Sequence, residues 1–322
     1  MGETNGPSAD LFDPMTTPQA DRERWLVLNP TSGTADHTDH VRALAEEHGY
    51  HVEETEWAGH AVDLAEIAAE EGADVVAAAG GDGTVHEVVQ GLARTDALDT
   101  TTLAVVPTGT ENIFASNLGI HDAEQAFGVV ETGARRYLDV GVTDDDEPFV
   151  MSCIAGLPAD ASVGATDEMK ERFGSLAFVI SGIQEMATFD GLHIDLSLVV
   201  DGEERTWSGD ALCTLVGNVR RFTGEGGQAN IEDGRFEVVV IEQMPTSNVV
   251  AEGIAHRLLG QDTEHVHHFQ ASQVEIASRE GDDIDFSLDG ELRSHDGLYL
   301  HTYPTALRVC VGPDYDPFVG DT

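Results

Sequence analysis

The sequence predicts an α/β fold in which a doubly wound parallel sheet is followed by a second domain, an antiparallel β-sandwich. Strand and helix patterns alternate from Trp25 to about Leu138, as in a parallel sheet whose crossovers are helices. From Tyr137 onward, short strand patterns dominate and are separated by turn signals such as Asp201-Gly202. Three strands of the first half end in polar turns that contain glycine.

The first half contains apolar runs that alternate with amphipathic segments. Strands are predicted at 25–29, 51–56, 74–79 and 103–106, and helices at 39–48, at 60–71 and after Gly83, Glu111 and Asp122. The carboxyl ends of parallel strands meet at one edge of a sheet. The turns that follow these strands are therefore expected to lie together, where open α/β sheets bind ligands.

The second half contains mainly strand patterns. They are predicted at 138–142, 149–154, 193–200, 205–216, 236–241, 267–276, 285–288, 298–303 and 307–311, with helices at 167–187 and 247–259. We therefore divide the chain into a flexible leader (1–23), an α/β domain (24–138) and a β-rich domain (139–315). The last strand is a candidate to return to the first domain.

The composition is that of a globular but very acidic protein. The chain has 322 residues, 41% of them hydrophobic, and a formal net charge of −44 from 60 acidic and 16 basic residues. Such a charge repels itself in dilute buffer and is screened by salt, so we expect a halophilic cytoplasm. It also excludes nucleic acid as a partner, because binding to a phosphate backbone needs clustered Lys and Arg.

The strand at 74–79 runs into Gly80-Gly81-Asp82-Gly83-Thr84 and then into a helix. Glycines let backbone N–H groups approach a polyphosphate, and the helix start adds unpaired donors and a positive dipole end. Asp82 can engage a metal ion or a substrate hydroxyl. Similar turns occupy 29–33 and 107–112, and three of them at one sheet edge predict a nucleotide site.

These turns resemble the catalytic domain of the diacylglycerol kinase family, which includes soluble bacterial lipid kinases and sphingosine kinases. The matching segments are NPTSG (29–33), GGDGTVHEV (80–88), PTGTENIFASNLGI (107–120), the G-x-x-x-D of 156–160, Gly217-Asn218 followed by Gly226-Gly227, and the D-G-E of 289–291. GGDGT also occurs in NAD kinases, whereas P-T-G-T-x-N together with D-G-E is fairly specific to the lipid-kinase branch. The resemblance spans roughly residues 24 to 315.

The residues and the resemblance together imply ATP and Mg²⁺ and a set of binding residues. The residue types themselves point to a phosphate cradle formed by Gly80, Gly81, Gly83, Thr84 and Thr110, with Asp82 beside it. The resemblance adds Asn29, Ser32, Gly33 and Thr55 for the nucleotide, Asp160 for the lipid head group, and Asn230, Asp233 and the Arg235 carbonyl for a structural Mg²⁺. A plain strand residue at Thr55 and a turn aspartate at Asp160 are the competing interpretations.

Three carboxylates compete for the role of general base. Asp82 matches the aspartate treated as the base in sphingosine kinases, whereas Asp289 and Glu291 match the residues favoured in the bacterial lipid kinases. We favour Glu291, because a tight turn explains Asp289-Gly290 but not the glutamate that follows. The basic residue common after NPxSG is missing. Arg220 and Arg221, or less directly Arg42, are the candidates to replace its charge.

These interpretations lead to an ATP-dependent kinase that phosphorylates the free hydroxyl of a diacylglycerol-like or other lipid alcohol. An NAD kinase and a non-catalytic nucleotide-binding regulator are the alternatives. No apolar run is long enough to span a bilayer, so we expect a cytoplasmic protein that meets its lipid substrate at the membrane surface. A homodimer is retained as an assembly to test.

Overall fold

The structure is a computed structural model, and it describes residues 23–33, 37–156, 191–219, 229–243 and 265–316. The predicted helices at 167–187 and 247–259 and the predicted leader up to residue 22 lie outside these ranges.

The first part of the chain is the predicted parallel α/β unit. Its strands run in the order β2-β1-β3-β4, all parallel, with the bounds β1 (Arg24–Leu28), β2 (His51–Glu54), β3 (Val75–Gly80) and β4 (Thr102–Pro107). The helices are α1 (Thr38–Glu47), α2 (His60–Glu70), α3 (Asp82–Arg94), α4 (Ile113–Asn117) and α5 (Ala123–Thr132). Every residue of β3 is buried, which explains its uninterrupted apolar sequence.

The second part is antiparallel and β-sandwich-like, as predicted. Its strands are β6 (Pro148–Phe149), β7 (Ser152–Ala155), β8 (Leu192–Val200), β9 (Glu203–Gly217), β10 (Phe236–Glu242), β11 (Val266–Ala271), β12 (Gln273–Ser278), β13 (Ile284–Leu288) and β14 (Glu291–His295). Alternate residues of β8 and β12 point into the core, so one face of these strands is apolar and the other polar.

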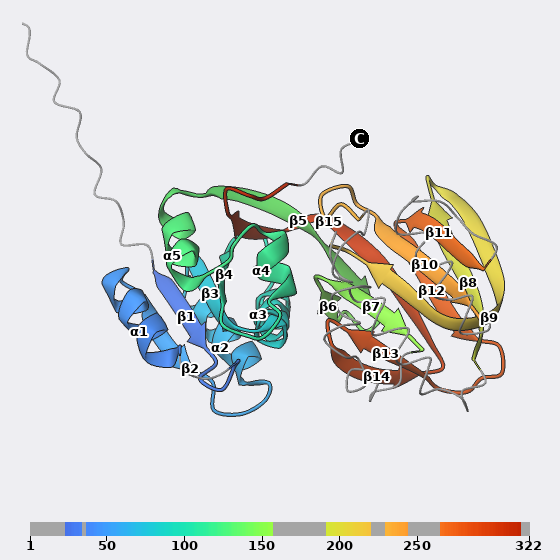
Figure 1. Ribbon diagram of the computed structural model, residues 1–322, viewed down its shortest axis with the longest axis horizontal. Helices are drawn as coiled ribbons and strands as arrows, with labels where there is room; N and C mark the ends of the chain where they lie inside the picture. The colour runs from blue at the N-terminus through green and yellow to red at the C-terminus, as the bar shows by residue number, and fades with distance from the viewer. Residues whose placement is uncertain (1–22, 34–36, 157–190, 220–228, 244–264, 317–322) are drawn as a thin grey trace, which may run out of the picture.

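Two long strands connect the two parts (Figure 1). They are β5 (Ala134–Thr143) and β15 (Gly297–Val311), which pair with each other antiparallel. One end of β15 lies parallel to β4 through the pair Val309 and Leu103, and the other end pairs antiparallel with β12. The strands of both parts therefore belong to one continuous hydrogen-bonded sheet.

The strand predictions differ from the structure in four places. The predicted strand at 149–154 is two strands, because β6 pairs with β5 whereas β7 pairs with β9 and β13. The predicted strand at 267–276 is interrupted at Ser272, because β11 pairs with β10 whereas β12 pairs with β8 and β15. The predicted strands at 298–303 and 307–311 are one strand, β15, with a register shift between Tyr303 and Leu307. Strand β14 was not predicted, because no residue in it is fully buried and the sequence has no apolar alternation there.

The apolar core has two centres. One lies between the parallel strands and their helices and includes Leu26, Phe114 and Phe127. The other lies within the β-rich part, where Phe149 and Phe236 stack with ring centroids 5.5 Å apart. Among the helices that the structure describes, none is both long and apolar enough to cross a membrane.

Candidate active site

A pocket of about 480 Å³ lies beyond the carboxyl ends of the parallel strands. Its lining residues are Asn29, Thr31, Ser32, Gly33, Thr55, Glu56, Trp57, Ala58, Gly81, Gly83, Thr84, Glu87, Gly109 and Thr110. Most residues predicted to bind the nucleotide are in this set, and Gly80 and Asp82 lie next to it in the chain. Three separate turns and the loop after β2 thus line one pocket.

The glycines of these turns are required because the turns touch. A Cβ on Gly109 would lie 2.4 Å from the Cα of Gly81, so the second and third turns meet backbone to backbone. Gly33 has φ +56°, and a Cβ there would lie 2.4 Å from the Thr108 carbonyl oxygen. At Gly80 a Cβ would lie 2.2 Å from the Thr84 hydroxyl. By contrast, nothing lies within 4 Å of a Cβ on Gly83, which is exposed in the pocket wall.

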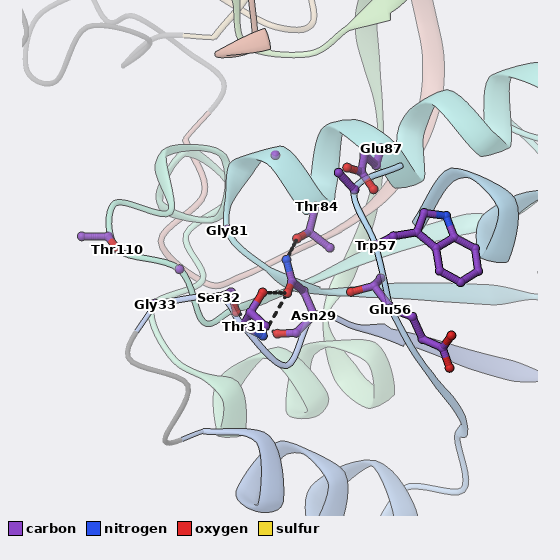
Figure 2. A pocket seen from close by; sticks show the side chains of 14 residues that line it. Asn29, Thr31, Ser32, Gly33, Glu56, Trp57, Gly81, Thr84, Glu87 and Thr110 are labelled. Atoms are coloured by element: carbon purple, nitrogen blue, oxygen red, sulfur yellow. Dashed lines mark hydrogen bonds between the residues drawn. The ribbon is translucent and has the colours of Figure 1, made fainter. Parts of the chain in front are cut away.

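Hydrogen bonds between polar side chains connect the turns (Figure 2). Asn29 donates from Nδ2 to the Thr84 hydroxyl over 3.0 Å, and its Oδ1 accepts from both the N–H and the hydroxyl of Thr31. The Ser32 hydroxyl lies 2.9 Å from that of Thr108. The side chains of the first turn are therefore oriented by the second and third turns.

Helix α3 begins directly at the pocket. Its N-cap residue is Gly81, and no side chain caps the helix start. The first N–H groups of a helix lack intrahelical partners, and they carry the positive end of its dipole. The helix start therefore offers N–H donors suited to an anion, in a pocket that the carboxylates of Glu56 and Glu87 also line.

Asp82 has a structural contact of its own. Its carboxylate accepts hydrogen bonds from the N–H of Ile113, at 3.0 Å, and of Phe114, at 2.9 Å, at the start of helix α4. Burial raises the pKa of Asp82, and the nearby Asp289 charge raises it further. The two hydrogen bonds lower this pKa but do not cancel the effect of burial. Asp82 thereby joins the glycine turn to the turn after β4.

Sequence reasoning predicted Thr55 but missed the rest of the pocket wall formed by the loop after β2. Glu87 of α3 accepts from the N–H groups of Gly59, at 3.0 Å, and Ala61, at 3.2 Å, and so fixes this loop and the start of α2. Trp57 is 56% exposed and stacks on His60 with ring centroids 3.7 Å apart. Figure 2 shows Trp57 at the opposite end of the pocket from Gly33 and Thr110. The two Glu87 contacts join residues 28 and 26 positions apart, so no local sequence pattern predicts them.

Asp289 is buried, and its carboxylate is fully engaged. Its side chain is 0% exposed, and its φ of +49° opens the turn before β14. The carboxylate accepts from three consecutive backbone N–H groups, those of Val150, Met151 and Ser152, at 2.7 to 2.9 Å. It also lies 3.1 Å from Nδ1 of His86 on α3. Glu291, two residues later, is exposed.

Buried charges surround His86. Burial lowers the pKa of its imidazole, but the contacts with Asp289 and Glu147 outweigh burial and raise the pKa to about 9. The contacts with His86 and Arg293 lower the pKa of Glu147 to about 2, against the effect of burial. Arg293, on β14, forms a bidentate pair with Glu147 at 2.5 and 3.0 Å.

The residues predicted for a structural metal ion lie together in the turn before β10. Asn230 accepts from the N–H of Glu232, Asp233 accepts from the N–H of Arg235, and the Arg235 guanidinium pairs with Asp201 at 2.8 Å. Within the described ranges, no cluster of three or more His, Cys, Asp or Glu side chains is placed to hold a metal ion.

Other predicted residues fall outside the site as described. Asp160, Arg220 and Arg221 lie beyond the described residues. Arg42, the remaining candidate for the missing basic charge, pairs with Glu54.

Comparison with known proteins agrees with this architecture. A model of the diacylglycerol kinase catalytic domain matches residues 23–143, and a model of the YegS C-terminal NAD kinase beta sandwich-like domain matches residues 152–311. Residues 23–143 belong to the diacylglycerol kinase catalytic-domain family. The predicted resemblance is thereby confirmed for both halves of this lipid-kinase-like protein.

Relatives and solved structures extend the comparison over most of the chain. "Lipid kinase YegS" of Escherichia coli (strain K12) is 28% identical over 270 residues, which cover 82% of this chain and 87% of the relative. The crystal structure of a "putative diacylglycerol kinase" from Bacillus anthracis str. Sterne matches with a TM-score of 0.75 at 21% identity, covering 92% of this chain and 97% of that one. A second diacylglycerol kinase structure from the same source matches with a TM-score of 0.69 at 18% identity, covering 92% and 98%. The structural likeness shows that the fold is shared.

Proposed function

We propose that this lipid-kinase-like protein transfers the γ-phosphoryl group of ATP to the free hydroxyl of a diacylglycerol-like lipid alcohol. One observation carries the proposal. Helix α3 begins at the glycine-lined pocket and, one turn further on, contacts through His86 the turn that ends in the exposed Glu291. A phosphate-binding helix start and a candidate base thus belong to one connected unit.

In this proposal the ATP phosphates lie at the start of α3. The backbone of Gly81 and Gly83 and the hydroxyls of Thr84 and Thr110 are available in the pocket wall. Phosphoryl transfer requires mainly positioning and charge stabilisation, which oriented N–H groups and hydroxyls provide. Asn29 and Ser32 act by holding these groups in place, and the loop from Thr55 to Ala58 borders the far end of the nucleotide.

Mg²⁺ fits this site as a companion of the nucleotide. The Asp82 carboxylate accepts two backbone N–H groups, so about two of its four lone-pair sites remain for the ion or for its waters. Such an ion keeps several waters and takes one or two carboxylates, so Asp82 is the residue that would face it. The ion would supply neutralisation of the phosphate charge.

We assign the base to Glu291. Asp289 has its carboxylate occupied by three N–H groups and His86, and Asp82 caps α4, whereas Glu291 is exposed at the first position of β14. The Glu291 carboxylate accepts the proton of the lipid hydroxyl as that oxygen attacks the γ-phosphorus, the bond from the γ-phosphorus to the β–γ bridging oxygen breaks, and ADP leaves. Asp289 and Gly290, with φ +100°, fix the turn that presents it.

The proposal is tested by incubating the protein with γ-labelled ATP, Mg²⁺, molar KCl and one acceptor at a time. The acceptors are diacylglycerol, dialkylglycerol, a sphingoid base, undecaprenol and NAD. Label in a glycerolipid is the expected result, and the strongest of these acceptors names the substrate class. Label in NAD alone would replace the lipid kinase with an NAD kinase. Tight ATP binding without label in any acceptor would favour a non-catalytic regulator.

A further inference from the structure

A cluster of polar and charged side chains joins helix α3 to the strand that begins with Glu291. It consists of His86 and Gln90 on α3, Glu147 before β6, Asp289 in the turn after β13, and Arg293 on β14, and we call it the Glu147 cluster. These five residues come from three segments far apart in the sequence. All five lie outside the pocket lining, and of them only His86 belongs to the glycine motif at 80–88.

Glu147 is the centre of the cluster. Its carboxylate accepts from Nε2 of Gln90 at 2.9 Å and from Nε and Nη2 of Arg293 at 3.0 and 2.5 Å. Nε2 of His86 lies 3.9 Å from it. A planar guanidinium bound in two places fixes both the position and the direction of β14 relative to Glu147.

Asp289 forms the second connection. It binds the N–H groups of Val150 to Ser152, which follow Glu147 closely in the chain, and it contacts Nδ1 of His86 on the other side. The imidazole of His86 therefore has Asp289 at one nitrogen and Gln90, at 3.0 Å, at the other. Helix α3 is held to this segment at two side chains, His86 and Gln90, one helical turn apart.

These contacts bear directly on Glu291. The turn has Asp289 on one side and Arg293 on the other, so both ends of the segment that contains Glu291 are held. Glu291 and Arg293 are separated by one residue on β14, and alternate residues of a strand share a face. The hydrogen bond to Glu147 is the main cause of the raised pKa of Arg293, and the Glu291 charge adds a smaller contribution.

Burying these charged groups costs free energy, so stability alone does not account for the presence of the cluster. The side chains of His86 and Asp289 are 1% and 0% exposed, and those of Glu147 and Arg293 are 20% and 32% exposed. Buried ion pairs are often no better for stability than apolar residues of the same size. What they fix is geometry, since each partner is held in a single direction.

We propose that the Glu147 cluster positions Glu291 relative to the phosphate-binding start of α3, with Glu147 and Arg293 as positioning residues for phosphoryl transfer. This inference rests on the proposed function. Neither residue need touch ATP or lipid. A displacement of about 1 Å of a reacting group can lower a rate about a hundredfold, so a loosened β14 lowers kcat while the pocket still binds the nucleotide.

The test compares Arg293→Gln, Glu147→Gln and the double variant with wild type. We expect kcat for lipid phosphorylation to fall by about tenfold or more in each single variant, with the ATP dissociation constant from calorimetry changed less than about twofold. Because the two residues act as a pair, the double variant should lose no more than the worse single variant. Arg293→Lys, which keeps the charge but not the bidentate geometry, should recover part of the loss.

A matched control removes an ion pair elsewhere. Glu131→Gln breaks the pair between Arg24 of β1 and Glu131 of α5, which also joins separate elements. It should leave kcat and ATP affinity unchanged. Melting curves in molar KCl establish that each variant is folded before its kinetics are compared.

Hydrogen exchange provides a readout that does not depend on activity. In Arg293→Gln the N–H groups of residues 290–293 should exchange faster than in wild type, whereas those of β3 should not change. Unchanged kcat and unchanged exchange in the folded Arg293→Gln variant would overturn the proposal, as would equal losses of kcat and ATP affinity. If wild type phosphorylates no lipid, the proposed function fails, and hydrogen exchange alone then decides whether the cluster positions this turn.

Discussion

Gly81 and Gly109 meet backbone to backbone, so that a Cβ on Gly109 would lie 2.4 Å from the Gly81 Cα. The two glycines come from the turns after β3 and β4, and both line the pocket. Their contact sets the distance between the two turns that we propose bind the ATP phosphates.

Gly109→Ala should therefore lower ATP affinity by about tenfold or more, because the added methyl group must push the turns apart and displace the N–H groups that contact phosphate. Calorimetric titration with ATP measures the effect. Gly128→Ala is the matched control, since nothing lies within 4 Å of a Cβ at that position in α5. Equal ATP affinity in both variants would remove the glycine contact from the binding site.

Asp289 and Glu291 should differ in what their loss does to stability. Asp289→Asn places an amide NH₂ group where three N–H donors and His86 need an acceptor, so it should destabilise the fold by about 1 to 3 kcal/mol or more. Glu291→Gln changes an exposed side chain and should leave the melting temperature unchanged. Thermal unfolding in molar KCl compares the two. A stable Asp289→Asn variant that has lost kcat would return Asp289 to the role of base.

The His86 contact should stabilise the fold in a pH-dependent manner. The pKa of His86 is raised from 6.5 to about 9 in the folded state, so its stabilising contribution is complete below pH 6.5 and is lost as the pH rises through 9. The difference in unfolding free energy between wild type and His86→Gln should accordingly shrink between pH 6 and pH 9.5. Denaturant unfolding at constant salt measures it.

Protonation of His86 also affects its contact with Gln90. Nε2 of Gln90 lies 3.0 Å from Nε2 of His86 and donates to Glu147, and two donors cannot face each other, so Gln90 keeps its hydrogen bond to Glu147 and makes none to His86 when the ring is charged. A stability difference that stays constant over this pH range would show instead that His86 is neutral and accepts from Gln90.

Trp57 should report nucleotide binding. It is exposed at the pocket edge, whereas Trp25 is buried in the core, so a ligand in the pocket changes the surroundings of Trp57 alone of these two. Trp207 lies on β9, outside the pocket lining, and serves as the control. We expect ATP to change the tryptophan fluorescence of wild type and of Trp207→Phe but not of Trp57→Phe. A signal that persists in Trp57→Phe would show that the adenine end of ATP does not lie against the loop after β2.

The acidic surface should make stability depend on salt. With a formal net charge of −44, repulsion between carboxylates is strong in dilute buffer and is screened as ionic strength rises. The melting temperature should rise steeply from dilute buffer to molar KCl. A curve that does not depend on salt would contradict the halophilic interpretation.

The sequence predicted the pocket better than it predicted the chemistry around Asp289. Glycine turns after apolar strands are local patterns, and the parallel sheet brings them together by topology, so Gly33, Gly81 and Thr110 were predictable as neighbours. The environment of Asp289 was not, because its partners are the backbone N–H groups of residues 150–152, which carry no side-chain signature.

The remaining differences have similar causes. Glu87 lies within the GGDGTVHEV motif, but its contact with Gly59 depends on how α2 packs against α3. The register shift in β15 follows from Pro304, which lacks an N–H, and from Thr305, whose N–H donates to the buried Asp139. In the sequence such a residue pair indicates a break between strands, whereas the fold accommodates it as a bulge.

The central claim is that ATP bound at the start of α3 loses its γ-phosphoryl group to a lipid hydroxyl deprotonated by Glu291. The most direct measurement is the rate of lipid phosphate formation at saturating ATP, for wild type and for Glu291→Gln, with ATP binding determined on the same preparations. We expect lipid-dependent product in wild type, and in Glu291→Gln a rate reduced by about a hundredfold or more at unchanged ATP affinity. Equal rates in the two proteins, or ATP binding without any lipid product in wild type, would contradict it.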